Sequence, residues 1–238
     1  MFGSKNLKRA RVAVLAADGY EKAELTAPAD ALRERGARVE IVSLHPGSIR
    51  GVNLHEPAGR IRVDHSLADA DAGAYDALLI PGGLVNPDLL RQSAEARAFV
   101  RAFDTAGKPV ASLCHGPGVL ASAGLARGRM LTSWPGLREE FVQAGAAWRD
   151  EAVVRDRNWV TGRSPQDMNA FIRAMCDLFA EAGAAAAGGP RLQPAAPVQK
   201  AQRVLRSLPR PSAKTLLGLA VIGAGIAVAT RRRHSVAG

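Results

Sequence analysis

One of the two cysteines stands where a β-type run turns into a helix-like stretch. The run Pro109–Leu113 ends at Cys114, and small or turn-forming residues then lead into Val119–Gly124. This is the layout of a nucleophile elbow, in which the reactive atom lies at the corner between strand and helix. Free N–H groups and the positive dipole end of such a helix favour the thiolate. The sequence therefore predicts that Cys114 is a nucleophile with a lowered pKa, the alternative being an inert buried thiol.

The second cysteine has a different setting. Cys176 lies among apolar residues of the predicted closing helix, and we expect it to pack in the core. Two cysteines make no disulfide framework, and the basic, polar start Met1–Ala10 does not read as a signal peptide. We therefore expect a reducing, cytoplasmic setting for the catalytic part.

Two carboxylates and a glycine loop are expected to join the cysteine. Glu21 and Glu24 lie three residues apart at the start of a predicted helix, just after an apolar run. The loop Pro81-Gly82-Gly83 ends another apolar run, and its glycines let backbone N–H groups approach a substrate oxygen. Because ligands of open α/β sheets bind at the carboxyl ends of the strands, these segments should meet at one edge.

Two of these residues have plainer interpretations. Glu21 can be a solvated helix residue beside Lys22, and His115 can serve only to hydrogen-bond the backbone of the turn. The sequence leaves both alternatives open.

The elements that position these residues alternate between strand and helix. Continuous apolar strands separated by helices are typical of a parallel sheet covered on both faces, an α/β doubly wound fold. We expect one such domain over residues 7–182. Its predicted strands are Arg11–Ala17, Arg38–Leu44, Ala77–Ile80 and Pro109–Leu113, its helices Glu21–Arg35, Ala94–Phe103 and Pro165–Glu181, and a hairpin joins Ala152–Arg155 to Trp159–Gly162.

The formal net charge of +10 belongs to the end of the chain. From Gly183 onward there are nine Lys and Arg and no acidic residue, which leaves 23 basic and 22 acidic residues before it. A nearly neutral domain argues against a nucleic-acid-binding face. No nucleic-acid partner is expected.

The segment after the domain differs in composition. We expect residues 183–214 to form a flexible basic linker, and residues 215–230 are sixteen uncharged residues followed by three arginines. As a helix, the apolar run would be ~24 Å long, against ~30 Å for the hydrocarbon core of a bilayer. It is predicted as a transmembrane or membrane-anchoring helix that holds the domain at the inner face of the membrane. The alternative is an amphipathic or disordered tail that packs on the domain or on a partner.

Several ordered motifs together resemble the ThiJ/PfpI superfamily, in particular its intracellular protease I (PfpI) branch, over about residues 11–180. No single motif is specific, but their order is. They are Tyr20-Glu21-Lys22-Ala23-Glu24-Leu25, Tyr75–Gly83, Asn86-Pro87-Asp88, Gly107–Val110, Cys114-His115-Gly116-Pro117, Leu131–Pro135 and Ala144–Ala146 with Trp148.

The resemblance implies a flavodoxin-like three-layer α/β/α sandwich, related to class I glutamine amidotransferases, with Cys114 as nucleophile. Glu24 matches the carboxyl group that hydrogen-bonds the cysteine sulfur, with Glu21 beside it, and His115 matches the family's histidine. The acidic partner of that histidine comes from a neighbouring subunit, at the position of Asp88 here. The oxyanion site would be formed by backbone N–H groups of the glycine loop, at Gly82 and above all Gly83, together with that of His115 at the elbow.

The assembly expected from the resemblance is a homodimer or a larger ring built from dimers. Asp88 can also be an ordinary helix N-cap after a proline, which needs no second subunit. No cofactor is expected. No metal is expected either, because the spacing of His45, His55 and His65 lacks a ligand pattern.

The sequence and the resemblance together predict a cysteine-dependent stress enzyme, a hydrolase. Its substrate would be a reactive carbonyl, in a glyoxalase III or deglycase-like reaction, or a peptide, in a protease reaction. The alternative is a non-enzymatic redox sensor or chaperone-like stress protein in which Cys114 oxidises. A glutamine amidotransferase activity is rejected, because the only histidine after His115 is His234 in the tail.

Overall fold

The computed structural model describes residues 7–188 of the 238-residue chain, and the side chains of residues 7–184. Its centre is a seven-stranded sheet with the order β11-β12-β8-β7-β1-β3-β6. Neighbouring strands are parallel except for the β11–β12 hairpin. The strands are β1 (Arg11–Leu15), β3 (Arg38–Ser43), β6 (His65–Ser66), β7 (Ala77–Ile80), β8 (Val110–Leu113), β11 (Val153–Asp156) and β12 (Trp159–Gly162).

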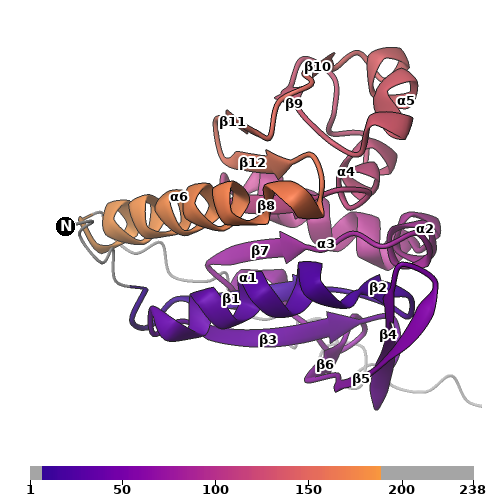
Figure 1. Cartoon of the computed structure of the whole chain (residues 1–238). Helices are drawn as coiled ribbons and strands as arrows, with labels where there is room; N and C mark the ends of the chain where they lie inside the picture. Colours follow the sequence, from indigo (N-terminus) through magenta and orange to yellow (C-terminus); the bar gives the residue numbers. More distant parts are fainter. Residues whose placement is uncertain (1–6, 189–238) are drawn as a thin grey trace, which may run out of the picture. The chain divides into compact units, whose positions relative to one another are not determined.

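Six α-helices and three short 3-10 helices accompany the sheet within these residues (Figure 1). The predicted mostly parallel α/β fold is confirmed. The helices are α1 (Lys22–Glu34), α2 (Val85–Gln92), α3 (Ala94–Thr105), α4 (Pro117–Ser122), α5 (Arg138–Gln143) and α6 (Met168–Gly188), with 3-10 turns at Ala72–Ala74, Pro135–Leu137 and Pro165–Asp167.

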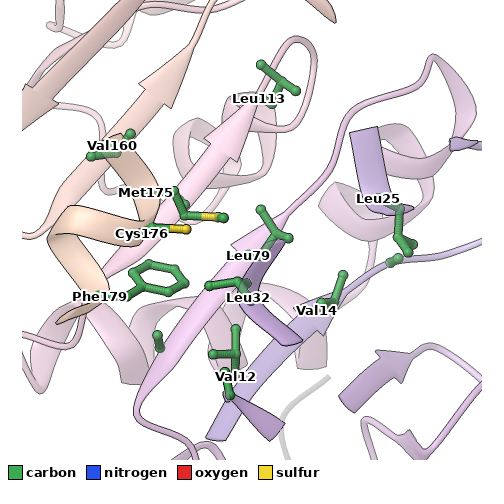
Figure 2. Close-up of a cluster of buried hydrophobic side chains, with 14 of the residues drawn as sticks. Val12, Val14, Leu25, Leu32, Leu79, Leu113, Val160, Met175, Cys176 and Phe179 are labelled. Carbon is green, nitrogen blue, oxygen red and sulfur yellow. The ribbon is translucent and has the colours of Figure 1, made fainter. Parts of the chain in front are cut away.

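The core lies on both faces of the sheet, because strand side chains alternate between them. Val12 and Val14 of β1 belong to one buried cluster, while Ala13 and Leu15 belong to the other. Figure 2 shows the first cluster, in which side chains of α1 and α6 meet those of the sheet. The labelled side chains there are Val12, Val14, Leu25, Leu32, Leu79, Leu113, Val160, Met175, Cys176 and Phe179. Cys176 is buried, as predicted.

Two small sheets were not expected from the sequence. A three-stranded sheet has the order β2-β4-β5, and β9 pairs with β10. The long hairpin of β4 and β5 is held down by Ile49 and Ile61, which lie opposite each other and pack with the first cluster. The strands are β2 (Tyr20–Glu21), β4 (Ser48–Asn53), β5 (Glu56–Arg62), β9 (Met130–Leu131) and β10 (Ala147–Trp148).

The predicted boundary at residue 182 needs a correction. Helix α6 continues to Gly188, because the run Ala184–Ala187 consists of the best helix-forming residue. The first six residues of the expected linker are therefore helical, and its remainder lies outside the described residues.

The expectation of a membrane-spanning helix is also corrected. In the part of the chain that the structure describes, no helix has the length and apolar character needed to cross a bilayer. The segment 215–230 itself lies outside that part.

Candidate active site

The backbone at Cys114 has the shape of a nucleophile elbow. Its φ of 60° is in the left-handed region, which costs a non-glycine residue about 1–2 kcal/mol. Two hydrogen bonds hold it there: the Cys114 N–H donates to the Gly162 carbonyl (3.0 Å), and its own carbonyl accepts from the Trp134 N–H (2.8 Å). At Gly116 a Cβ atom would collide with the Ile80 carbonyl and the Ser112 hydroxyl, so the turn requires glycine. Sites that keep such strain are often functional.

The structure brings Glu24 of α1 next to this elbow. Its side chain is buried, with a residue exposure of 1%. The Gly82 N–H donates to Glu24 Oε2 at 2.8 Å, and a hydrogen bond between Glu24 and the Cys114 side chain affects the pKa of both. A Cβ atom on Gly82 would collide with Glu24 and press on Cys114. Glycine at this position therefore permits the carboxyl group and the thiol to meet.

Burial sets the protonation of the carboxyl group. Desolvation raises the pKa of Glu24 to about 7, hydrogen bonds from Cys114 and Gly82 oppose the shift, and the negative charge of Glu21 adds to it. Within residues 7–188 no cation pairs with Glu24. The carboxyl group consequently changes its protonation near neutral pH, which suits a proton-transfer role.

The pKa of the cysteine differs from the sequence prediction. Burial raises the pKa of the Cys114 thiol, and the Glu24 carboxylate raises it further, while the His115 backbone N–H lowers it. The predicted lowering of the Cys114 pKa is wrong, because burial and the neighbouring Glu24 carboxylate outweigh the His115 N–H. A thiolate at this position needs the proton to be on Glu24, so above about pH 7, where the pair has lost its first proton, the two groups share the one that remains.

His115 lies beside the sulfur and is held by an aromatic ring. Its Nδ1 is 3.3 Å from Cys114 Sγ, and its ring stacks on Trp134 with centroids 5.6 Å apart. Burial lowers the pKa of His115, so the imidazole is neutral at pH 7. A neutral imidazole can either donate to or accept from the sulfur.

Glu21 serves a local structural purpose here. Its Oε2 accepts a hydrogen bond from the Leu54 N–H (2.8 Å) at the tip of the β4–β5 hairpin. It influences the site through its charge, which raises the pKa of Glu24. Glu21 lies half-buried in β2, just before α1, so it is not the solvated helix residue of the plainer interpretation, and its role in the site stays a prediction.

Asp88 does not meet His115 within the protomer. It is exposed in the first turn of α2, where its carboxylate accepts from Gln92 Nε2 at 3.1 Å. The N-cap of α2 is Leu84, so Asp88 is not a capping residue. Its predicted role in a neighbouring subunit stays a prediction.

One part of the expected oxyanion site is already occupied. The Gly82 N–H donates to Glu24, which removes Gly82 as a donor to a substrate oxygen. Gly83 follows it and packs against the backbone of Gly19 and Tyr20. The N–H groups of Gly83 and His115 remain the predicted donors.

Sequence reasoning missed the residue that holds the glycine loop. Asn86 is fully buried; its Oδ1 accepts from the Ala17 N–H (2.6 Å), and its Nδ2 donates to the Pro81 and Gly82 carbonyls (2.9 and 3.0 Å). It thereby ties the end of β1 to the loop that contacts Glu24. The signal was an amide in the motif Asn86-Pro87-Asp88, directly after the loop. Trp134 was likewise noted only as part of a motif.

Comparison with known proteins gives a consistent result over this region. The model of the DJ-1/PfpI family matches residues 10–178. A deglycase of Pyrococcus abyssi is 39% identical over 169 residues, which is 71% of this chain and 99% of the relative. YraA of Bacillus subtilis, whose name proposes a cysteine protease, is 38% identical over 170 residues, 71% of this chain and 98% of that protein.

A solved structure shows the same fold. Drosophila melanogaster DJ-1beta superposes with a TM-score of 0.66 at 28% sequence identity. The match covers 76% of this chain and 97% of the other. The similarity thus extends over nearly the whole length of these proteins.

Proposed function

Since the chain belongs to the DJ-1/PfpI family, we propose that it is a cysteine-dependent enzyme that converts small reactive carbonyl compounds, with Cys114 as nucleophile. The observation that carries the proposal is the buried Glu24 carboxyl group. It has a pKa of about 7 and contacts the thiol at the elbow. The deglycase names of relatives such as that of Pyrococcus abyssi support this substrate class.

The protons can be followed through the reaction with methylglyoxal. The Cys114 sulfur bonds to the aldehyde carbon while the thiol proton passes to Glu24, and the carbonyl oxygen takes up the electron pair. Backbone N–H groups of Gly83 and His115 stabilise the oxyanion, which is then protonated to give a hemithioacetal.

The second half of the reaction needs a proton carrier. Movement of the C1 proton to C2, through the neutral His115 beside the sulfur, gives a lactoyl thioester. Addition of water then releases lactate and restores the thiol. Carbon C1 is oxidised and C2 is reduced within one molecule, so the balance requires no external electron acceptor.

The burial of the nucleophile favours a small substrate over a peptide. Cys114 is only 5% exposed, and a two-carbon carbonyl unit needs less space at the sulfur than a polypeptide backbone. Peptide hydrolysis is the second candidate function, because the relative YraA of Bacillus subtilis is named as a cysteine protease.

The test is glutathione-free consumption of methylglyoxal by the full chain, with lactate as the measured product. We expect Cys114→Ala to abolish turnover, a loss of at least about 1000-fold. Cys176→Ala is the matched control, because Cys176 is the other buried cysteine and lies in α6, and it should keep its activity.

Two outcomes would contradict the proposal. Equal turnover in the wild type and Cys114→Ala would exclude the nucleophile. Absence of turnover in a folded wild type would instead favour peptide hydrolysis or the non-enzymatic role, in which Cys114 is oxidised and its sulfinate is held by Glu24.

A further inference from the structure

A cavity of about 460 Å³ opens beside the β4–β5 hairpin. Cys114, Glu24 and His115 are not among the residues that line it, so it is separate from the proposed active site. The side chains that give the cavity its chemical character are Arg50, Arg60, His45, His55, Ser48 and Asp18. The cavity thus gathers four basic side chains around one acid.

The two arginines lie directly opposite each other on neighbouring antiparallel strands. Arg50 of β4 is in register with Arg60 of β5, one position along from the buried pair Ile49 and Ile61. Since strand side chains alternate, the isoleucines face the core and the arginines face the cavity. Like charges directly opposite are destabilising, which favours an anion between them.

Asp18, the acidic residue of the cavity, already has hydrogen-bond partners other than the two guanidinium groups. Asp18 accepts from the Arg50 backbone N–H at 2.8 Å and lies 3.2 Å from His45 Nε2. Within residues 7–188 neither Arg50 nor Arg60 forms an ion pair through its guanidinium group, although the Asp18 charge acts on Arg50 over a longer distance. One carboxylate faces two guanidinium groups, so the cavity has a net positive charge.

We propose that this cavity binds a phosphate group, which Arg50 and Arg60 hold from the two strands. Each guanidinium group is a planar fork of donors that matches two phosphate oxygens at once. His55 and Ser48 supply further donors on the rim of the cavity, whereas both ring nitrogens of His45 already contact the Pro46 carbonyl and Asp18. A dianion balances the unpaired charge better than a carboxylate does. The phosphate group is either inorganic phosphate or part of a small phosphate ester.

The first experiment is a calorimetric titration of the full chain with inorganic phosphate at constant ionic strength. We expect saturable binding of one phosphate per chain and at least a 10-fold weaker affinity in Arg60→Gln and in Arg50→Gln. Arg62→Gln is the matched control: it removes the same charge from the same strand, but Arg62 does not line the cavity. Its affinity should stay within about 2-fold of the wild type.

The control also accounts for phosphate that binds to the basic residues after Gly183, because these residues are the same in every variant. Equal weakening in Arg62→Gln and Arg60→Gln would overturn the proposal, because binding would then follow overall charge. Absence of saturation would overturn it as well.

A second titration identifies the source of the phosphate group. Glycerol 1-phosphate that binds more tightly than inorganic phosphate would support a small phosphate ester, and weaker binding of the ester would support free phosphate. Acetate that binds as tightly as phosphate would contradict the proposal, since the cavity would then not distinguish a phosphate from a carboxylate.

Discussion

Strands β8 and β12 lie side by side, with a polar cluster at each end of the pair. The charged groups of one cluster form an ion pair, whereas the acid of the other has no partner of opposite charge among the described residues. At the amino end the Arg129 guanidinium group pairs with Asp104 and lies 4.0 Å over the Trp159 ring. Asp104 also accepts from Trp159 Nε1 at 2.8 Å. At the carboxyl end, Glu24 is buried beside Cys114, and no cation among the described residues pairs with it.

This difference in charge pairing indicates that the Arg129–Asp104 cluster is structural and that the Glu24–Cys114 cluster is reactive. A buried charge with an opposite charge and several hydrogen bonds contributes to stability, provided that every member stays in place. A buried acid without a cation keeps a raised pKa and exchanges its proton near pH 7. Substitutions at the first cluster should therefore change stability, and those at the second should change reactivity.

The largest expected effect on stability is at the structural cluster. Arg129→Leu leaves the Asp104 carboxylate without its cation, and we expect a loss of about 3–5 kcal/mol in the free energy of unfolding. Denaturant unfolding of the full chain measures it. Arg127→Leu, at an exposed neighbouring position, should change stability by less than about 0.5 kcal/mol. Equal effects of the two substitutions would mean that the cluster has no special role.

Glu24→Gln should separate reactivity from stability. The amide can still accept from the Gly82 N–H, but it cannot take the thiol proton, so lactate formation should fall by about 100-fold or more. At pH 8 the variant should be more stable than the wild type by about 2–3 kcal/mol, because it buries no carboxylate. A variant that is both active and less stable would contradict the comparison.

The stability of the wild type should itself depend on pH through Glu24. Its folded pKa of about 7 lies above the ordinary value of 4.5, so the folded state keeps the proton up to a higher pH than the unfolded state does. The contribution of Glu24 to the free energy of unfolding is fully present below about pH 4.5 and falls as the pH rises towards 7. Above pH 7 the free energy of unfolding is lower by about 2–3 kcal/mol than at pH 4.5. The effect is isolated by measuring the free energy of unfolding of the wild type and of Glu24→Gln between pH 4.5 and pH 8 and taking the difference at each pH. A flat difference would show that Glu24 titrates normally.

The smallest expected effect concerns the ring that holds His115. Removing the stack in Trp134→Ala should lower kcat/KM by about 5-fold, because an aromatic pair contributes about 0.5–1.5 kcal/mol. Trp134→Phe keeps an aromatic face and should recover most of the activity. Equal losses in the two variants would mean that the indole acts in another way.

Much of this architecture could be predicted from the sequence. Strands such as Ala77–Ile80 and Val110–Leu113 are buried on both faces, so the first is a continuous apolar run and the second is apolar except for Ser112. The elbow could be located because strand, cysteine and small residues follow one another. Glu24 could be placed near Cys114 because both follow parallel strands.

The remainder depends on contacts that a local pattern does not contain. The β4–β5 hairpin carries Gly51, Pro57 and Gly59 and only a few apolar residues, and it is stabilised by distant packing of Ile49 and Ile61. Helix α2 escaped prediction because Pro87 interrupts a short polar stretch. The raised pKa of Cys114 follows from burial next to Glu24, which becomes visible only once the fold brings α1 to the elbow.

The most direct test of the account is the rate of Cys114 alkylation by iodoacetamide as a function of pH, followed by mass spectrometry on the folded full chain. The Cys114–Glu24 pair should become reactive as its first proton leaves, so the rate should rise through about pH 7. Buried Cys176 should stay unlabelled, and the inflection should be absent in Glu24→Gln. A wild-type rate that shows no inflection near pH 7, or the same profile in Glu24→Gln, would contradict a shared proton at this site.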